Sequence, residues 1–243
     1  DFKSNLIENG IKIGQIFDGV SQKINTPSID LYYERGLKNQ QKVYANIVGS
    51  YAKVETGRNY IEYDNANTLF KEQFGLSSDK YSLIAEGIYE KGFTYGSLKF
   101  GAKHIQSFTK QEVQQNGVFK SDLNQMETSV FSEWNHSKDK FSCSLGLKAN
   151  RVHFSNISIN KSYYNFLPKA MLGYRLNENS FIRYDVEMSQ TNPTLVELTD
   201  TEIRLDPYLA ERGNLLLKPY SNLNNNLFYE HKKGLFTFNA NLR

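Results

Sequence analysis

Four histidines are the residues in this sequence best suited to metal binding or acid–base catalysis. They lie far apart in the chain, and none forms a recognisable metal-ligand motif: His104, His136, His153 and His231. The sequence also lacks a GxSxG nucleophile turn, a glycine-rich phosphate loop and an EF-hand pattern. We therefore predict no catalytic residue, no metal site and no cofactor, and we expect that the protein is not an enzyme.

The single cysteine, Cys143, has no second cysteine with which to form an internal disulfide. It falls on the apolar side of its predicted strand, where the expected role is that of a small apolar filler. The 243 residues carry a net charge of +3 without a basic stripe, so nucleic-acid binding is not predicted.

The elements that hold these residues follow a repeated unit of two alternating strands joined by a tight polar turn. The five tight turns lie at 36–42, 90–94, 137–140, 177–180 and 231–234. Longer polar connections alternate with them, near 56–79, 110–122, 156–162 and 191–219. Short turns at one end and long loops at the other are typical of an up-and-down outer-membrane barrel.

Ten strands are predicted from this alternation. They lie near 28–36, 42–55, 80–90, 95–109, 123–136, 140–155, 163–176, 180–190, 220–231 and 234–243. Segment 11–17 is predicted either as a further strand or as part of a loop. Segment 194–203 has room for a short helical turn after Pro193.

The predicted strands have one apolar and one polar face. In two of them the apolar face consists of Ile182, Tyr184, Val186 and Met188, and of Phe236, Phe238, Ala240 and Leu242. Asn239 and Asn241 alternate with the second set. Several polar faces carry bulky charges: Asp30, Glu34, Lys99, Lys103, Lys148, Arg183, Asp185 and Glu187. A large barrel turns such a face toward a wet lumen, whereas a soluble sandwich exposes it to water.

The hydropathy of the chain suits a barrel wall. Hydrophobic residues make up 39% of the sequence and the mean hydropathy is −0.57. No run approaches the ~18 apolar residues that a membrane helix needs. Only alternate residues of a membrane strand face lipid, so a polar average is compatible with an apolar outer face. The prediction is an all-β, antiparallel up-and-down meander that forms a segment of a transmembrane β-barrel.

Segments 190–200 and 205–230 resemble a region of the TonB-dependent outer-membrane receptors of Bacteroidetes, in the branch called the outer-membrane β-barrel family. Segment 26–53 is similar to an early barrel hairpin of the same family. Leu215 stands where the family usually has Pro, and Tyr220 where it often has Glu. The residues that match a GNPxLKPE-like motif and the strand after it are Gly213, Asn214, Leu217, Lys218, Pro219, Tyr229 and Glu230.

The resemblance implies a 22-stranded barrel, of which residues 1–243 are a partial domain of about ten strands without the plug or the closing strands. It implies import of a scarce solute, such as an iron chelate, vitamin, glycan or peptide, across the cell outer membrane. The implied partners are outer-membrane lipid, TonB acting through the absent plug, the solute, and a surface lipoprotein. The motif residues are expected to be structural, and the sequence identifies no ligand contact.

Two alternatives stay open at this stage. One is a complete, smaller barrel that acts as a pore, adhesin or surface enzyme. The other is a soluble all-β binding module, whose apolar face would pack on a second sheet.

Overall fold

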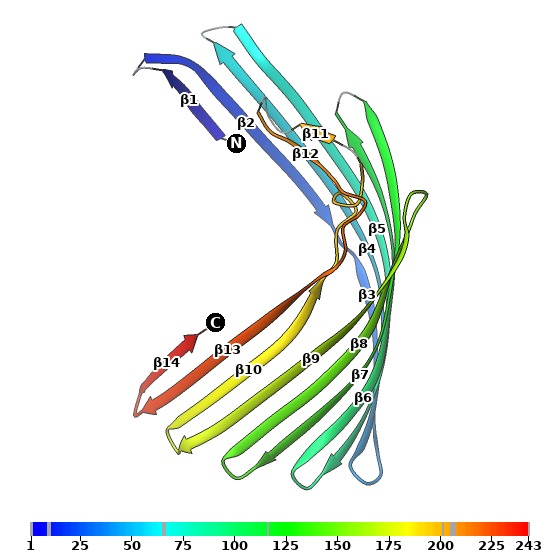
Figure 1. The fold of residues 1–243 in the computed structure, drawn as a ribbon, viewed down its shortest axis with the longest axis vertical. Helices are drawn as coiled ribbons and strands as arrows, with labels where there is room; N and C mark the ends of the chain where they lie inside the picture. The colour runs from blue at the N-terminus through cyan, green and yellow to red at the C-terminus, as the bar shows by residue number, and fades with distance from the viewer. Residues whose placement is uncertain are drawn as a thin grey trace.

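The computed structural model is all-β and describes residues 2–8, 11–64, 67–115, 117–200, 202–204 and 208–242. Twelve strands form one antiparallel sheet, and two short strands form a separate hairpin (Figure 1). The predicted fold class is therefore confirmed. The strands are β1 (Phe2–Glu8), β2 (Ile11–Asn25), β3 (Ser28–Leu37), β4 (Gln41–Asp64), β5 (Asn67–Phe93), β6 (Gly96–Gln114), β7 (Val118–Lys138), β8 (Phe141–Ser155), β9 (Asn160–Asn177), β10 (Ser180–Thr191), β11 (Glu202–Arg204), β12 (Ala210–Arg212), β13 (Tyr220–Lys233) and β14 (Phe236–Leu242).

The strands of the large sheet follow one another as an up-and-down meander. Its order is β1-β2-β4-β5-β6-β7-β8-β9-β10-β13-β14, and β3 continues the line of β2 along the same edge of β4. The predicted hairpin between 28–36 and 42–55 is present, with Tyr33 opposite Ala45. All five tight turns lie at one end of the sheet, as predicted (Figure 1). Asn39, Asp139 and Gly234 adopt positive φ in three of them, a conformation that Asn, Asp and Gly tolerate best.

Two of the four predicted long connections prove to be largely strand. Segment 56–79 belongs to β4 and β5, and only residues 65–66 lie outside the description. Segment 110–122 likewise belongs mostly to β6 and β7, whereas the connection predicted at 156–162 is present at residues 156–159, before β9 begins at Asn160. The prediction of loops at 56–79 and 110–122 was wrong because polar residues continue the backbone ladder wherever a neighbouring strand is available. We refer to the described residues of 56–79 as the rim ribbon.

Residues before Ser28 also extend the sheet. Ile11–Asn25 forms β2, which resolves the ambiguity at 11–17 in favour of a strand, and β1 was not predicted. β2 pairs with β4 from Lys53 to Asp64, and this range includes the β4 half of the rim ribbon. Asp18 on β2 accepts two hydrogen bonds from Arg58 on β4, at 2.9 Å from Nε and 2.8 Å from Nη2. This two-point contact joins the ribbon to the edge strand.

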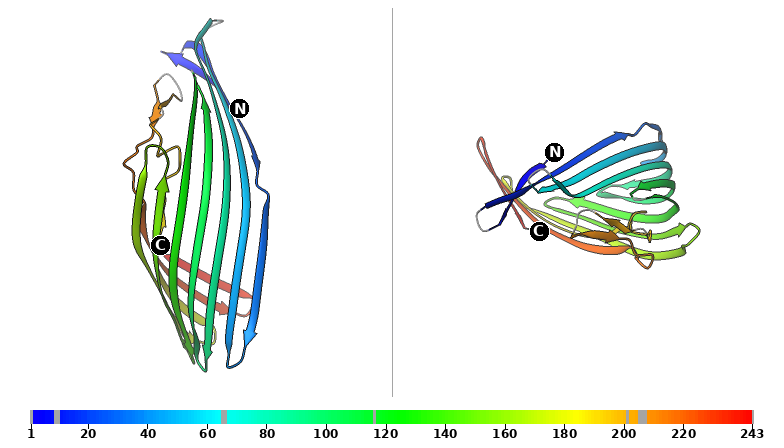
Figure 2. Two further views of the ribbon diagram at one scale, coloured as in Figure 1. Left: turned by 90° about the vertical axis from the view of Figure 1, so that its right-hand side faces the viewer. Right: turned by 90° about the horizontal axis from the view of Figure 1, so that it is seen from above.

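The sheet is strongly curved, so its two faces differ (Figure 2). Residues directly opposite each other on neighbouring strands share a face, and this register places Val186 with Ala170 and Glu187 with Lys169. The convex face carries an apolar band, which includes Ile29, Leu31, Ile47, Leu83, Phe100, Val130, Leu145, Leu147, Phe166, Leu172 and Tyr184. The predicted separation of apolar and charged faces is confirmed by this register.

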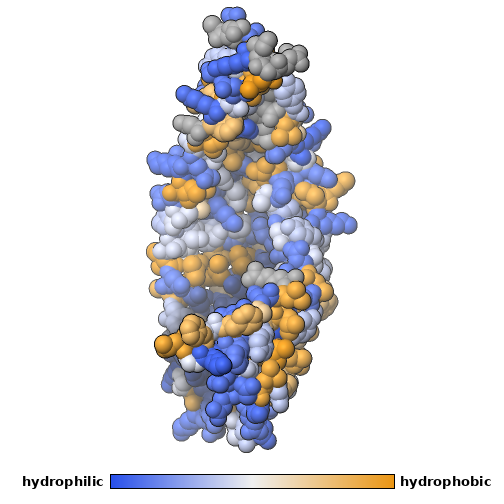
Figure 3. Space-filling view, turned by 90° about the vertical axis from the view of Figure 1, so that its left-hand side faces the viewer, coloured by the Kyte–Doolittle hydropathy of each residue, from blue (hydrophilic) through white to orange (hydrophobic). Residues whose placement is uncertain are grey.

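Aromatic side chains border the convex band at two heights. Toward the long connections, the rings of Tyr51 and Tyr81 lie 5.0 Å apart. Toward the tight turns, Trp134 stacks on His136 at 5.7 Å. Figure 3 shows the concave face of the sheet, opposite to the convex band. Hydrophilic residues cover much of the surface visible in this view.

The two edges of the sheet are not paired with each other. All ten residues of β3 and all seven of β14 are exposed, so among the described residues the sheet is open rather than closed into a barrel. No described helix is long and apolar enough to cross a membrane.

Candidate functional site

A recess of about 320 Å³ is the best-formed hollow on the concave face of the sheet. Its walls come from β7, β8, β9 and β10, and from the start of the connection that follows β10. Most of the residues that line it are polar, and the apolar members are Phe131, Leu147, Leu167 and Met188. The strands bring these residues together although they are up to 65 positions apart in sequence, from Glu127 to Asn192.

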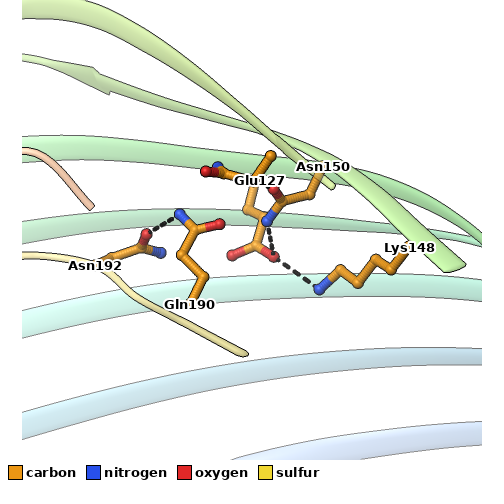
Figure 4. A network of polar contacts seen from close by, with 6 residues as sticks. Glu127, Lys148, Asn150, Gln190 and Asn192 are labelled. Carbon is orange, nitrogen blue, oxygen red and sulfur yellow. Dashed lines mark hydrogen bonds and ion pairs between the residues drawn. The ribbon is translucent and has the colours of Figure 1, made fainter. Parts of the chain in front are cut away.

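A linked polar cluster forms the floor of the recess (Figure 4). Lys148 on β8 lies 3.1 Å from the carboxylate of Glu127 on β7. Asn150 donates to the same carboxylate oxygen at 3.2 Å, and Asn165 on β9 donates to Asn150 at 3.2 Å. The charge of Glu127 is therefore balanced within the wall, and the lining also contains amides and the carboxylate of Glu187.

Gln190 enters the recess from β10. Pairing between β9 and β10 ends at Glu187, so the last residues of β10 separate from their neighbour at this height. The Nε2 group of Gln190 donates to Asn192 at 2.7 Å, and Figure 4 shows the side chain reaching toward Glu127. Its Oε1 atom is buried but accepts no hydrogen bond from any residue that the structure describes.

The connection over residues 192–219, which we call the rim loop, docks on the concave face above the recess (Figure 1). Leu195 and Leu198 of the loop are 6% and 2% exposed. They form a small core with residues of β7 and β8 and of the turn that follows: Leu123, Val152, Phe154 and Ile159. The part of the loop that contains Leu195 and Leu198 is therefore packed against the wall.

A single helical turn gives the loop its first bend. The predicted turn is present at residues 195–198, where the N–H of Leu198 donates to Thr194 O at 3.1 Å. Thr194 and Glu197 form a capping box, because the backbone and hydroxyl of Thr194 donate to Glu197 Oε2 at 2.7 and 2.8 Å. These hydrogen bonds lower the pKa of Glu197 below its ordinary value of 4.5.

The second half of the rim loop folds back onto this turn at Gly213. A Cβ atom at Gly213 would meet the carbonyl oxygens of Thr199 and Val196, so this contact needs a residue without a side chain. The N–H of Asn214 donates to Glu197 O at 2.7 Å. Lys161 on β9 in turn donates to Leu215 O at 3.2 Å, which joins the returning chain to the wall.

The outer part of the rim loop is the hairpin of β11 and β12. Gln115, at the end of β6, fastens it through two hydrogen bonds with the backbone of Arg204, at 2.5 Å from Nε2 and 2.9 Å to Oε1. Arg212 pairs with Asp200 at 2.7 Å, and this hydrogen bond lowers the pKa of the Asp200 carboxyl.

With this geometry known, comparison with other proteins identifies the family. The family model described as "TonB dependent receptor-like, beta-barrel" matches residues 12–242. The chain belongs to the TonB-dependent receptor-like β-barrel family. No curated protein is similar enough in sequence to count as a match.

Two solved structures share the architecture of this TonB-dependent receptor-like barrel. One is BauA, the ferric preacinetobactin receptor from Acinetobacter baumannii, with 13% sequence identity over 93% of this chain and a TM-score of 0.59. The other is the copper transporter OprC, with 8% identity over 91% of this chain and a TM-score of 0.50. At this identity the likeness shows the fold alone. The chain spans 37% of the length of BauA and 47% of the length of OprC.

The motif residues of this TonB-dependent receptor-like chain all lie in the second half of the rim loop. Gly213 and Asn214 contact the helical turn, and Leu217 donates its N–H to Asn214 O at 3.1 Å. Lys218 and Pro219 directly precede β13. None of the five lines the recess.

The histidines stay apart, each with a different neighbour. His104 contacts Thr128, His153 contacts Ser162, and His231 contacts Ser180. Within the described ranges, no group of three or more His, Cys, Asp or Glu residues is arranged to hold a metal ion. Cys143 is a buried free thiol on the convex face, opposite Leu172.

The sequence did not identify the residues of the recess as a site. Lys148 was recognised only as one charge on a polar face, and Glu127 and Gln190 were not singled out. The available signal was the alternation of side chains along consecutive strands, because it places Glu127, Lys148 and Asn165 on one face. Their heights along the strands depend on a register that the sequence alone does not supply.

Proposed function

We propose that this chain is part of the wall of an outer-membrane TonB-dependent receptor that imports a scarce solute. The observation that supports the proposal is the contrast between the two faces of the sheet, in a chain that belongs to this family. An apolar convex face suits lipid, and a concave face with ion pairs and amides suits a wet lumen. The solute classes considered are iron chelates, vitamins, glycans and peptides.

The dimensions of the convex band agree with a membrane span. Tyr81 and Tyr89 lie on the same face of β5 at the two borders of the band. The strand between them measures about 26 Å at ~3.3 Å per residue. With a tilt of ~40°, it would cover about 20 Å of thickness, close to the ~25 Å apolar band of outer-membrane barrels.

The remaining features of the proposal concern the intact receptor. Lipid surrounds the convex face, an N-terminal plug couples the barrel to TonB, and a surface lipoprotein assists capture of the solute. Further strands close the open sheet into a barrel of 22 strands. Origin in Bacteroidetes and the absence of enzymatic activity remain predictions.

A pair of substitutions on adjacent residues tests the orientation in the membrane. Val186→Arg should cost roughly 2–4 kcal/mol if Val186 lies on the lipid face near the membrane midplane, whereas Glu187→Arg should cost much less. Refolding titrations of the intact protein into lipid vesicles would measure both. Equal costs would contradict the assignment of the two faces.

Deletion of residues 197–210 tests the role of the rim loop in transport. We expect loss of solute uptake by cells while the barrel still assembles, because the deletion removes the docked turn above the recess. Assembly is checked by heat-modifiable migration of the intact protein on gels. Unchanged uptake would leave the loop with a covering role only.

A further inference from the structure

Several amide side chains lie in or beside the recess. Asn150, Asn165, Gln190 and Asn192 line or adjoin the recess itself. The row continues on β13, where Asn224 lies opposite Glu187 and Asn226 opposite Asp185 on the same face. Amides both donate and accept hydrogen bonds, as hydroxyl groups do, so this wall matches a ligand rich in hydroxyls.

The cations near the recess are paired with carboxylates in the wall, and Glu187 adds to the lining a carboxylate for which the described residues show no ion pair. Lys148 pairs with Glu127, and Lys169 pairs with Glu133. Next to them, Arg183 pairs with Asp185 at 2.8 Å. Recognition of an anionic chelate relies on cations that form charge-assisted bonds with the ligand. Because these cations already have carboxylate partners, the recess is better suited to a neutral solute.

One buried acceptor in the recess has no hydrogen-bond donor. Gln190 Oε1 accepts no hydrogen bond from the described residues. A buried polar atom without a partner is costly, and its occurrence in a folded protein calls for an explanation. A ligand hydroxyl that donates to Gln190 Oε1 would remove that cost in the bound state.

An apolar surface complements the amides. The ring of Phe131 occupies the space over Gly101, its cross-strand partner on β6, and Leu167 lies nearby in the recess lining. A ring at this position can contact the C–H groups of a sugar while the amides bind its hydroxyls. Apolar lining with a few placed polar groups is the usual composition of a small-molecule site.

We propose that the recess binds a neutral carbohydrate, with Gln190 accepting a hydrogen bond from a sugar hydroxyl. This proposal rests on the proposed transport function and specifies the class of its solute. The volume of about 320 Å³ is at the lower end of the ~300–1,000 Å³ of small-molecule sites. The recess would therefore hold one end of an oligosaccharide.

The test is binding of neutral malto-, xylo- and manno-oligosaccharides to the intact purified protein, measured by calorimetry beside ferric citrate and Cu²⁺. The decisive variant is Gln190→Met, which keeps the size of the side chain but removes both the unpartnered acceptor and the Nε2 donor to Asn192, two changes with opposite effects on stability. We expect about tenfold weaker sugar binding, the effect of one buried hydrogen bond. We also expect no loss of thermal stability, whereas a purely structural Gln190 would leave sugar affinity unchanged.

The matched control is Gln114→Met, at the exposed end of β6, where the glutamine donates to Glu112 at 2.8 Å outside the recess. It should leave sugar binding unchanged. Binding of ferric citrate or Cu²⁺ without any of the sugars would overturn the carbohydrate assignment and leave the transport function standing. If none of the probes binds, the carbohydrate assignment fails, and the proposed function is judged separately by the Val186 and Glu187 substitutions.

Discussion

The rim ribbon and the rim loop lie at the same end of the sheet, and they adopt different structures. The ribbon continues the backbone ladder of β4 and β5, with Arg58 bound to Asp18 on the neighbouring strand. The loop abandons the ladder and packs side chains on the concave face instead. Both segments are polar, so polarity does not decide between the two outcomes.

Proline accounts for much of the difference. The segment 56–79 contains no proline, whereas 191–219 contains Pro193, Pro207 and Pro219. Proline removes a ladder donor and disfavours a continuous central strand. The comparison shows that a connection of this length either remains strand or must build its own small core, as the rim loop does with Leu195 and Leu198.

The largest expected effect on stability comes from disruption of the loop core. Leu198→Ala should destabilise the docked loop by about 2–5 kcal/mol, because Leu198 is 2% exposed and its removal leaves a cavity. Hydrogen exchange of the amides in 194–200 measures the free energy of local opening. Leu76→Ala in the rim ribbon is the control. It should cost less, since the half-buried Leu76 belongs to a continuous ladder.

A smaller effect is expected at the glycine contact. Gly213→Ala should cost about 1–3 kcal/mol through overpacking, because the new methyl group would meet two backbone carbonyls. Gly75→Ala in the ribbon meets only ordinary contacts, the nearest at 3.6 Å, and should be tolerated. Protease sensitivity of the rim loop distinguishes the two variants. Equal sensitivity would mean that Gly213 is not needed for docking.

Acidification should give the smallest loss of stability, and this loss should be confined to the rim loop. The folded pKa of Glu197 lies below its ordinary value of 4.5, so its contribution is fully present above that value. It is lost as pH falls from there through the folded pKa, when protonation weakens the capping box. Hydrogen exchange corrected for intrinsic pH dependence should show this loosening. Glu197→Gln, which keeps a capping side chain but does not titrate, should abolish it.

The sequence by itself determined the meander, its tight turns and its two faces. These features are local: alternation has a period of two, and Asn, Asp and Gly supply positive φ at turns such as Asn39 and Gly234. Ile182 and Arg183 therefore had to face opposite ways. The sequence also left room for a short helical turn after Pro193, and the structure shows that Thr194 and Glu197 cap it.

Only the tertiary structure decided which connections became strand and where the recess lies. β2 supplies the partner that keeps residues 53–64 extended, and it is distant in sequence. The recess requires Glu127, Lys148 and Gln190 to reach one height on three strands, and Gln190 enters it because β10 separates from β9 after Glu187. Strand register and the point at which pairing ends depend on the sum of many long-range contacts, and no local pattern of residues encodes that sum.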